Sequence, residues 1–310
     1  GRCDAVLLTR GGAPEPADVQ TLRSTKCESI DKNYDLVVAG GGIAGMCAAA
    51  AAARNGLKVA LVNDRPVLGG NNSSEIRVHL GGYVEMEPYK GLGRMIREFG
   101  HTEKGNARPA ESYQDWKKQA FIDAEENIDL YAPYHVMAVD TEASEIGSVT
   151  AVHIETGEKV RLHGRLFADC TGDGTVGFLA GADWTMGRES RDEYGERSAP
   201  VKADDMVMGA SVQWYSRKCP QKTVFPEFSY GVEFNASNCE KVTMGEWTWE
   251  TGMNRDQIAD AERVRDYGLL VIYSNWSCLK NHSGDAAYAD RSLDWVAYIA
   301  GKRESRRLLG

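Results

Sequence analysis

Short apolar runs separated by glycine and polar residues dominate the first part of the chain and predict buried strands. Asp35–Ala39 (DLVVA) and Lys58–Val62 (KVALV) are apolar runs bounded by turn residues, the pattern of strands buried on both faces of a sheet. Between them, the alanine-rich segment Gly45–Asn55 predicts a helix, and Gly56 follows at the position that favours left-handed backbone. A strand–helix–strand unit of about 30 residues predicts an α/β fold with a parallel sheet.

The periodicity of the following residues predicts that this sheet continues and carries an insertion. In chain order the predicted elements are helices at 91–99 and 113–127 and strands at 128–131, 136–141, 149–155, 159–162 and 165–169. The three strands between residues 136 and 162 alternate and are joined by short turns, one at Thr156-Gly157. They predict an inserted β-meander within a Rossmann-like domain.

The pattern changes after residue 200, and we expect a second, sheet-rich substrate lobe there. The predicted elements are strands Met206–Trp214 and Ser229–Phe234 and helices Asp256–Tyr267 and Leu293–Leu309. The predicted division is therefore 31–200 for the nucleotide-binding domain, 201–285 for the lobe and 286–310 for a returning helix. Residues 1–30, with a strand at Cys3–Thr9 and a Gly- and Pro-containing linker, are expected to be the tail of an upstream β module.

Composition and charge argue against some classes of binding partner. The net charge of −9 argues against nucleic acid, whose phosphates require clustered Lys and Arg. No apolar run reaches the roughly 18 residues of a membrane span. The seven cysteines are scattered, without CxxC or zinc-ligand spacing, so no metal site is predicted. The compartment is not fixed by these features; a periplasmic or other extracytoplasmic location is favoured over the cytoplasm.

The sequence GGGIAG at residues 40–45 is a GxGxxG motif between a predicted strand and a predicted helix. Gly40 allows the tight turn, Gly42 lets the backbone approach a diphosphate, and Gly45 lets the helix pack on the strand. The helix N-terminus then presents N–H groups and a positive dipole end to phosphates. In this context the motif predicts dinucleotide binding.

The second strand departs from the usual pattern at its end. An acid that binds the ribose hydroxyls is expected there, but the chain has Asn63 and then Asp64. Asn63 could bind the hydroxyls through its amide, and Asp64 could bind them or be a plain loop acid. This departure disfavours an ordinary NAD site.

The residues after Asp64 resemble a known family. Arg65-Pro66-Val67-Leu68-Gly69-Gly70 places a Gly-Gly pair after the second strand, followed by Asn71-Asn72-Ser73-Ser74-Glu75-Ile76-Arg77. These motifs resemble the bacterial branch of the FAD-dependent oxidoreductases in the two-dinucleotide-binding-domain flavoprotein superfamily. Three further segments also resemble that branch: the turn 171–174 (Thr-Gly-Asp-Gly), the aromatic segment 245–252 and the Arg-rich segment 301–307. The resemblance runs from about Tyr34 to Gly310.

The resemblance implies FAD as the cofactor and assigns candidate residues to it. The expected cofactor-binding residues are Gly40, Gly42, Ile43, Ala44, Gly45, Asn63, Asp64, Arg65, Gly69, Gly70, Asn71, Ser73, Thr171, Gly172 and Asp173. The candidate catalytic residues are His79 as a base and Arg303 from the Arg-rich segment, together with Glu75 and Arg77. Glu75 and Arg77 alternate along the chain, so they could share a face toward the flavin and orient the substrate, or form a surface ion pair. Related flavoproteins carry a further C-terminal segment that returns to the FAD domain, so we expect this chain to be a truncated form.

The implied activity is hydride transfer from a C–H bond of a small molecule to flavin N5, with an electron acceptor that the sequence does not name. Trp247 and Trp249 alternate on one predicted strand face, where they could stack on a sugar or pack in the lobe core. A carbohydrate is therefore the narrower hypothesis for the substrate. Two alternatives stay open: a non-redox flavin-containing lyase acting on saccharides, and a non-catalytic binding module with a degenerate FAD fold.

Overall fold

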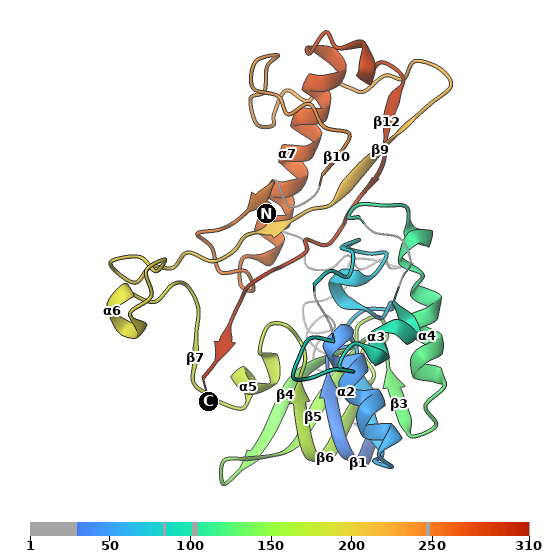
Figure 1. The fold of residues 1–310 in the computed structure, drawn as a ribbon, viewed down its shortest axis with the longest axis vertical. Helices are drawn as coiled ribbons and strands as arrows, with labels where there is room; N and C mark the ends of the chain where they lie inside the picture. The colour runs from blue at the N-terminus through green and yellow to red at the C-terminus, as the bar shows by residue number, and fades with distance from the viewer. Residues whose placement is uncertain (1–29, 83–84, 101–104, 246–248, 310) are drawn as a thin grey trace, which may run out of the picture.

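The computed structural model describes residues 30–82, 85–100, 105–245 and 249–309. A six-stranded sheet with its helices forms one part of the molecule, and a long helix with small antiparallel sheets forms the other (Figure 1). This arrangement confirms the predicted α/β fold. The strand predicted at Cys3–Thr9 and the side chain of Trp247 lie outside the described residues.

The six-stranded sheet has the order β3-β2-β1-β6-β5-β4. Its strands are β1 (Ile30–Ala39), β2 (Val59–Val62), β3 (Ile128–Tyr131), β4 (Tyr134–Glu142), β5 (Glu145–His153) and β6 (Lys159–Asp169). The pairs β3–β2, β2–β1 and β1–β6 are parallel, while β6–β5 and β5–β4 are antiparallel. The predicted meander is therefore present, and it extends the parallel sheet. The carboxyl ends of four parallel strands meet along one edge.

The strands predicted separately at 159–162 and 165–169 are one strand, β6. Gly164, between the two predicted segments, pairs with Tyr34 inside the ladder between β1 and β6. A Cβ on Gly164 would lie 3.0 Å from Val37 Cγ2, so this glycine permits close packing between β6 and β1.

Apolar residues cover both faces of the sheet. On one face, α2 (Ile43–Arg54), α3 (Arg94–Phe99) and α4 (Asp115–Asp123) pack through Met46, Phe99 and Phe121. On the other face, the β4–β5 pair and α5 (Thr175–Leu179) contribute to a second core with Val37, Val149 and Leu162. Burial on both faces explains why the parallel strands read as continuous apolar runs.

The second part is built around α7 (Ala261–Asn281), which Figure 1 shows standing away from the sheet. The helix was predicted to end at Tyr267, but it continues through Gly268. A Cβ there would lie 2.7 Å from Val212 Cγ2, so Gly268 lets the segment that contains Val212 approach the helix closely. Trp276 and Ile272 continue the buried stripe beyond it.

The predicted helix over 293–309 is wrong. Residues 291–296 form strand β12 (Arg291–Val296), and Arg307–Leu308 form the short strand β13. Leu293 and Trp295 alternate with polar residues, which is strand periodicity, and β12 pairs with β9 (Trp214–Lys218). The antiparallel sheet β10–β9–β12 includes β10 (Met244–Gly245).

The predicted strand Ser229–Phe234 is also wrong, and Met206–Trp214 is a strand only in part. Residues 229–234 form no strand; Val232 N donates instead to Ser274 Oγ on α7 at 2.9 Å. Within 206–214, only β8 (Ala210–Ser211) and the start of β9 are extended and paired.

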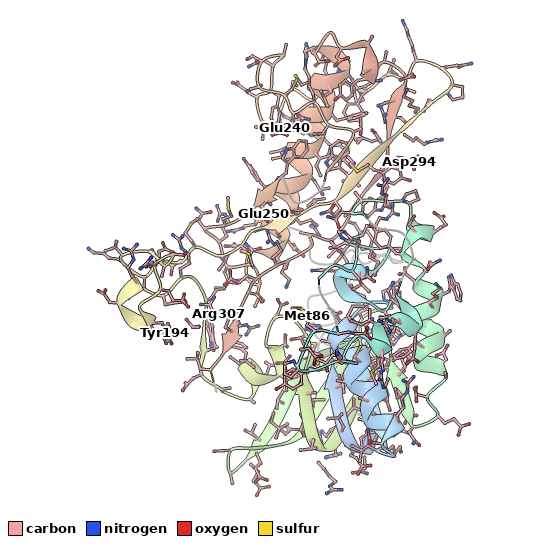
Figure 2. All side chains as sticks on the ribbon, in the orientation of Figure 1. Met86, Tyr194, Glu240, Glu250, Asp294 and Arg307 are labelled. Atoms are coloured by element: carbon pink, nitrogen blue, oxygen red, sulfur yellow. The ribbon has the colours of Figure 1, made fainter. Side chains whose placement is uncertain are left out.

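The remaining elements are short. They are η1 (Gly70–Asn72), η2 (Ala110–Tyr113), β7 (Trp184–Thr185), α6 (Arg191–Tyr194), β11 (Glu250–Thr251) and η3 (Ala286–Tyr288). β7 pairs with β13, and β8 pairs with β11. Figure 2 shows Tyr194 of α6 far from both the sheet and α7. None of the helices in the described ranges is both long and apolar enough to cross a membrane. The domain boundaries given above stay predictions.

Two leucines on β6 provide a test of the fold. Leu162 is fully buried and Leu166 is 62% exposed. We expect Leu162→Ala to lower the free energy of unfolding by about 2–5 kcal/mol, because it leaves a cavity in the core below the sheet. Leu166→Ala should change it by less than about 0.5 kcal/mol. Denaturant unfolding followed by circular dichroism measures both, and equal losses would contradict the burial of Leu162 in the core.

Candidate functional site

A cavity of about 760 Å³ opens at the carboxyl edge of the parallel strands, a volume in the range of small-molecule and cofactor sites. One wall is the edge of the sheet, from Gly40 to Ala44 and from Asn63 to Arg65. The opposite wall comes from the second part, including Ala210, Gln257 and residues 298–305. The cavity is therefore formed jointly by the two parts.

The glycine-rich turn is shaped by contacts that leave no room for side chains. A Cβ on Gly40, which has φ +104°, would lie 2.2 Å from Cys170 O, and one on Gly45 would lie 1.8 Å from Gly40 O. Gly42 and Ile43 line the cavity at the start of α2. This helix has no side-chain cap and no acid in its first turn. Its N-terminus therefore presents backbone N–H groups and a positive dipole end to the cavity, an arrangement that suits a phosphate.

Asn63 has a structural role, which is to hydrogen-bond two loops, and the sequence does not predict it. Its Oδ1 accepts from Gly41 N at 3.2 Å, and its Nδ2 donates to Arg65 O at 2.6 Å and to Val67 O at 3.1 Å. The buried amide thus ties the glycine-rich turn to the loop after β2. Of the two alternatives for the ribose hydroxyls, Asn63 has its polar atoms occupied, whereas the half-exposed Asp64 lines the cavity.

The loop with the second Gly-Gly pair is held against the first. Gly69 N donates to Gly41 O at 2.8 Å, and a Cβ on Gly69 would lie 2.7 Å from Lys118 Cδ. Lys118 is fully buried and donates to Tyr113 O at 2.7 Å and to Asp115 Oδ1 at 3.1 Å, while burial lowers its pKa. Ser73, predicted to bind the cofactor, is buried; its Oγ donates to Gly70 O at 2.8 Å.

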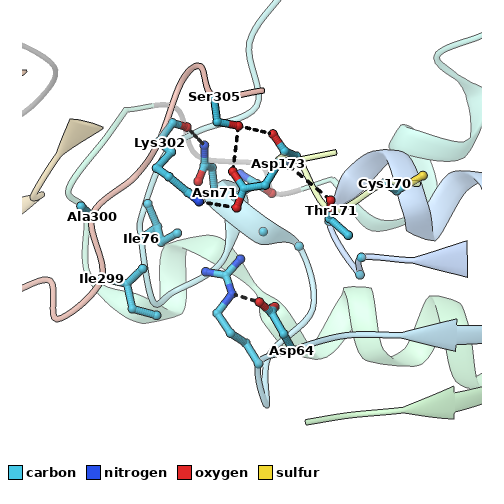
Figure 3. A pocket seen from close by; sticks show the side chains of 18 of the residues that line it. Asp64, Asn71, Ile76, Cys170, Thr171, Asp173, Ile299, Ala300, Lys302 and Ser305 are labelled. Atoms are coloured by element: carbon cyan, nitrogen blue, oxygen red, sulfur yellow. Dashed lines mark hydrogen bonds and ion pairs between the residues drawn. The ribbon is translucent and has the colours of Figure 1, made fainter. Parts of the chain in front are cut away.

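The Thr-Gly-Asp-Gly turn follows β6 and is connected to the second part. Thr171 Oγ1 donates to Asp169 Oδ1 at 2.7 Å, which shapes the turn. Asp173 accepts from Ser305 Oγ at 2.8 Å and forms an ion pair with Lys302. Asn71 Nδ2 donates to Lys302 O at 2.9 Å, so residues 302–305 bridge two sides of the cavity (Figure 3). Burial raises the pKa of the neighbouring Cys170 thiol, which disfavours a reactive thiolate there.

His79 lies on the cavity wall, as expected for a candidate base. Asn106 Oδ1 accepts from His79 N at 3.0 Å and lies 2.9 Å from His79 Nδ1. Because the backbone N–H identifies this atom of Asn106 as the oxygen, His79 Nδ1 donates to it. This hydrogen bond favours the tautomer whose lone pair is on Nε2, the nitrogen that could accept a proton.

Glu75 and Arg77 do not line the cavity, contrary to the prediction that they share one face toward the cofactor. Glu75 is 6% exposed and accepts from Tyr298 OH. Arg77 has φ +67°, so the alternation expected of a strand does not apply. Its guanidinium lies 3.6 Å from the centroid of the Trp295 ring, and burial lowers its pKa. Arg77 therefore joins the 70–77 loop to β12.

The arginines of the segment 301–307 have different surroundings. Arg303 lines the cavity and forms an ion pair with Glu250. Arg306 lies 3.9 Å from the centroid of the Phe178 ring, and Arg307 pairs with Glu304. Only Arg303 of these three lines the cavity. Trp249 stacks on Trp214 in the core beside α7, with ring centroids 5.7 Å apart, so it is a packing residue.

Several residues of the site were missed by the sequence analysis. Asn106, Lys302, Ser305, Tyr298 and His135 either line the cavity or hold a residue that does. Lys302 and Ser305 lie inside the recognised Arg-rich motif and could have been found there. Asn106 and His135 carry no local signal, because folding alone brings them to the cavity. Among the described residues, no cluster of His, Cys, Asp and Glu side chains could hold a metal ion.

A family model described as FAD dependent oxidoreductase matches residues 35–310. No curated protein matches the chain. Among solved structures, the myxobacterial chondrochloren halogenase CndH is similar at 15% identity over 62% of this chain and 46% of its own, with a TM-score of 0.40. The OxyS anhydrotetracycline hydroxylase from Streptomyces rimosus is similar at 19% identity over 62% and 39%, with a TM-score of 0.39. L-proline dehydrogenase from P. horikoshii is similar at 19% identity over 53% and 26%, with a TM-score of 0.31. The chain thus spans less than half the length of each of these structures.

The role of Asn63 can be tested by giving the chain the acid that is usual at this position. Asn63→Asp removes the donors to Arg65 O and Val67 O and buries a charge, so we expect a loss of more than about 2 kcal/mol in the free energy of unfolding. Asn55→Asp is the matched control, because Asn55 is exposed and donates to Ala51 O; its cost should stay under about 1 kcal/mol. Denaturant unfolding measures both, and an Asn63→Asp variant as stable as the control would refute the structural role.

Proposed function

We propose a specific redox reaction for this chain, which belongs to the family of FAD-dependent oxidoreductases and has FAD as its cofactor. The proposed reaction is the oxidation of a small alcohol or amine, with removal of a hydride from the substrate carbon. The observation that carries the proposal is the joint cavity, which places the glycine-rich turn and the wall of the second part around one space.

The residues along the cavity fit FAD. Gly42 and the uncapped start of α2 would hold the diphosphate, since backbone N–H groups and the helix dipole favour a negative charge. Asp64 would accept hydrogen bonds from the ribose hydroxyls. The turn Thr171–Asp173 and residues 299–305 would hold the flavin half. When bound, FAD supplies a hydride acceptor at N5 of the flavin ring.

His79 would accept the proton that leaves the substrate. Oxidation of an alcohol or amine carbon releases a proton from oxygen or nitrogen together with the hydride from carbon. In the tautomer that the contact with Asn106 favours, Nε2 of His79 would carry the lone pair, and Asn106 would hold the ring orientation through Nδ1. In this role, His79 is the catalytic base and Asn106 is a positioning residue.

The substrate is proposed more narrowly as a carbohydrate. Gln257, Glu262 and Arg303 line the cavity wall opposite the glycine-rich turn and supply polar groups suited to hydroxyls. The ring of Trp249 does not contribute aromatic stacking, because it is packed against the core beside α7 and does not line the cavity. A flavin-dependent lyase reaction on a saccharide would use the same polar wall, but it would leave the flavin oxidised at the end of the reaction.

Absorbance spectroscopy of the purified chain titrated with FAD tests the proposal. We expect bound flavin bands near ~375 and ~450 nm that bleach under anaerobic conditions with a reducing alcohol, amine or sugar. Product formation without bleaching at any stage would favour the lyase alternative. Absence of FAD binding would reject the redox proposal and favour a binding module.

The assignment of His79 predicts a selective kinetic defect. With a substrate that reduces the wild-type flavin, His79→Ala should lower the rate of anaerobic flavin reduction about 10²- to 10⁴-fold while FAD stays bound. Stopped-flow absorbance at 450 nm measures this rate. The control is His153→Ala, because His153 lies on β5 and does not line the cavity; an equal effect of both variants would exclude His79 as the base.

A further inference from the structure

Arg65 places a guanidinium beside the two glycine turns of the cavity. The position that a Cβ on Gly70 would take lies 3.2 Å from Gly42 Cα and 3.8 Å from Arg65 Nη2. Gly42, Gly70 and Arg65 all line the cavity. The cation is therefore next to the start of α2, where the helix dipole already favours an anion.

Glu75 is the buried carboxylate that forms an ion pair with this guanidinium. Its Oε2 lies 3.8 Å from Arg65 Nε, and its side chain is only 6% exposed. A carboxylate this deeply buried needs a cation and hydrogen-bond donors, and Arg65 provides the nearby positive charge. Asp64 is also 3.8 Å from Arg65 Nε, but it is 55% exposed and is screened by water.

Tyr298 completes the group from the second part of the molecule. Its OH donates to Glu75 Oε1, while burial and the neighbouring carboxylate raise the Tyr298 pKa to about 12. Tyr298 therefore stays a neutral donor at ordinary pH. It lies between β12 and β13, in the same chain segment as Lys302 and Ser305. The segment 298–305, which lines the cavity, thus also holds the Glu75 carboxylate that pairs with Arg65.

We propose that Glu75 and Tyr298 are positioning residues that aim Arg65 at the diphosphate of the bound nucleotide. This inference rests on the proposed binding mode of FAD at the glycine-rich turn, and it replaces a catalytic role for Glu75. One nitrogen of the Arg65 guanidinium, Nη1, is buried without a hydrogen-bond partner among the described residues. Arginine offers five N–H donors in a planar fork that matches phosphate oxygens, so a ligand diphosphate would supply the missing acceptors.

The ligand class that this group recognises is a nucleoside diphosphate, independent of the flavin ring. ADP and riboflavin separate the two halves of FAD, because ADP carries the diphosphate without the flavin and riboflavin carries the flavin without a phosphate. Isothermal titration calorimetry of the full chain with each compound is the experiment. Circular dichroism melting of each variant tests whether the fold is retained.

We expect Glu75→Gln and Arg65→Met each to weaken ADP binding about 10- to 100-fold, since each removes a charged interaction at the phosphate site. Riboflavin binding should change by less than about twofold, because that ligand does not reach the diphosphate position. The double variant should bind ADP no more weakly than Arg65→Met alone, because Glu75 acts through Arg65. Tyr298→Phe should weaken ADP binding by several-fold and keeps the test available if Glu75→Gln fails to fold.

Glu98→Gln is the matched control. Glu98 pairs with Arg54 near the other end of α2, so its loss should leave ADP affinity unchanged. An unchanged or tighter ADP affinity in Glu75→Gln, or additive losses in the double variant, would overturn the inference while FAD binding by the wild-type chain kept the proposed function. A wild-type chain that binds neither FAD nor ADP would overturn both.

Discussion

The close packing of the first glycine turn against the end of β6 is the constraint on which the site depends. Gly40 approaches Cys170 O so closely that no Cβ fits, and Gly45 approaches Gly40 in the same way. This contact puts the start of α2 beside the turn at 171–174. The two segments that face the cavity from the sheet are therefore fixed relative to each other by backbone contacts, before any ligand contributes.

The parallel sheet could be predicted because its signals are local. A buried strand, a glycine turn and an alanine-rich helix follow one another within about 30 residues, and each agrees with its neighbours. The second part was less predictable, because its elements depend on contacts between distant segments. The helix α7 continues through Gly268, where the missing Cβ makes room for Val212. The strand β12 pairs with β9, about 75 residues distant, and this partner gives no local signal in residues 293–309.

The candidate site was predictable where one short segment carries the whole signal, as at Gly40–Gly45. It was not predictable where residues act through partners that folding supplies. Asn63 occupies the position of a ribose-binding acid, but its amide joins two loops. The spacing of Glu75 and Arg77 predicts a shared face, but the backbone at Arg77 is left-handed, and Glu75 contacts Tyr298 while Arg77 contacts Trp295. The side chains that hold them come from more than 200 residues away, beyond the reach of periodicity.

The single strand β6 belongs at once to the parallel ladder with β1 and to the antiparallel ladder with β5. Its first half, Val160–His163, is paired along both edges, whereas Leu166–Asp169 pairs with β1 alone and leads directly into Cys170 and the turn at 171–174. Opening of the meander would therefore expose the first half of β6 and leave intact the ladder with β1 that positions this turn. The amide hydrogens of Leu166–Asp169 are consequently expected to exchange together with the parallel ladder and not with the meander.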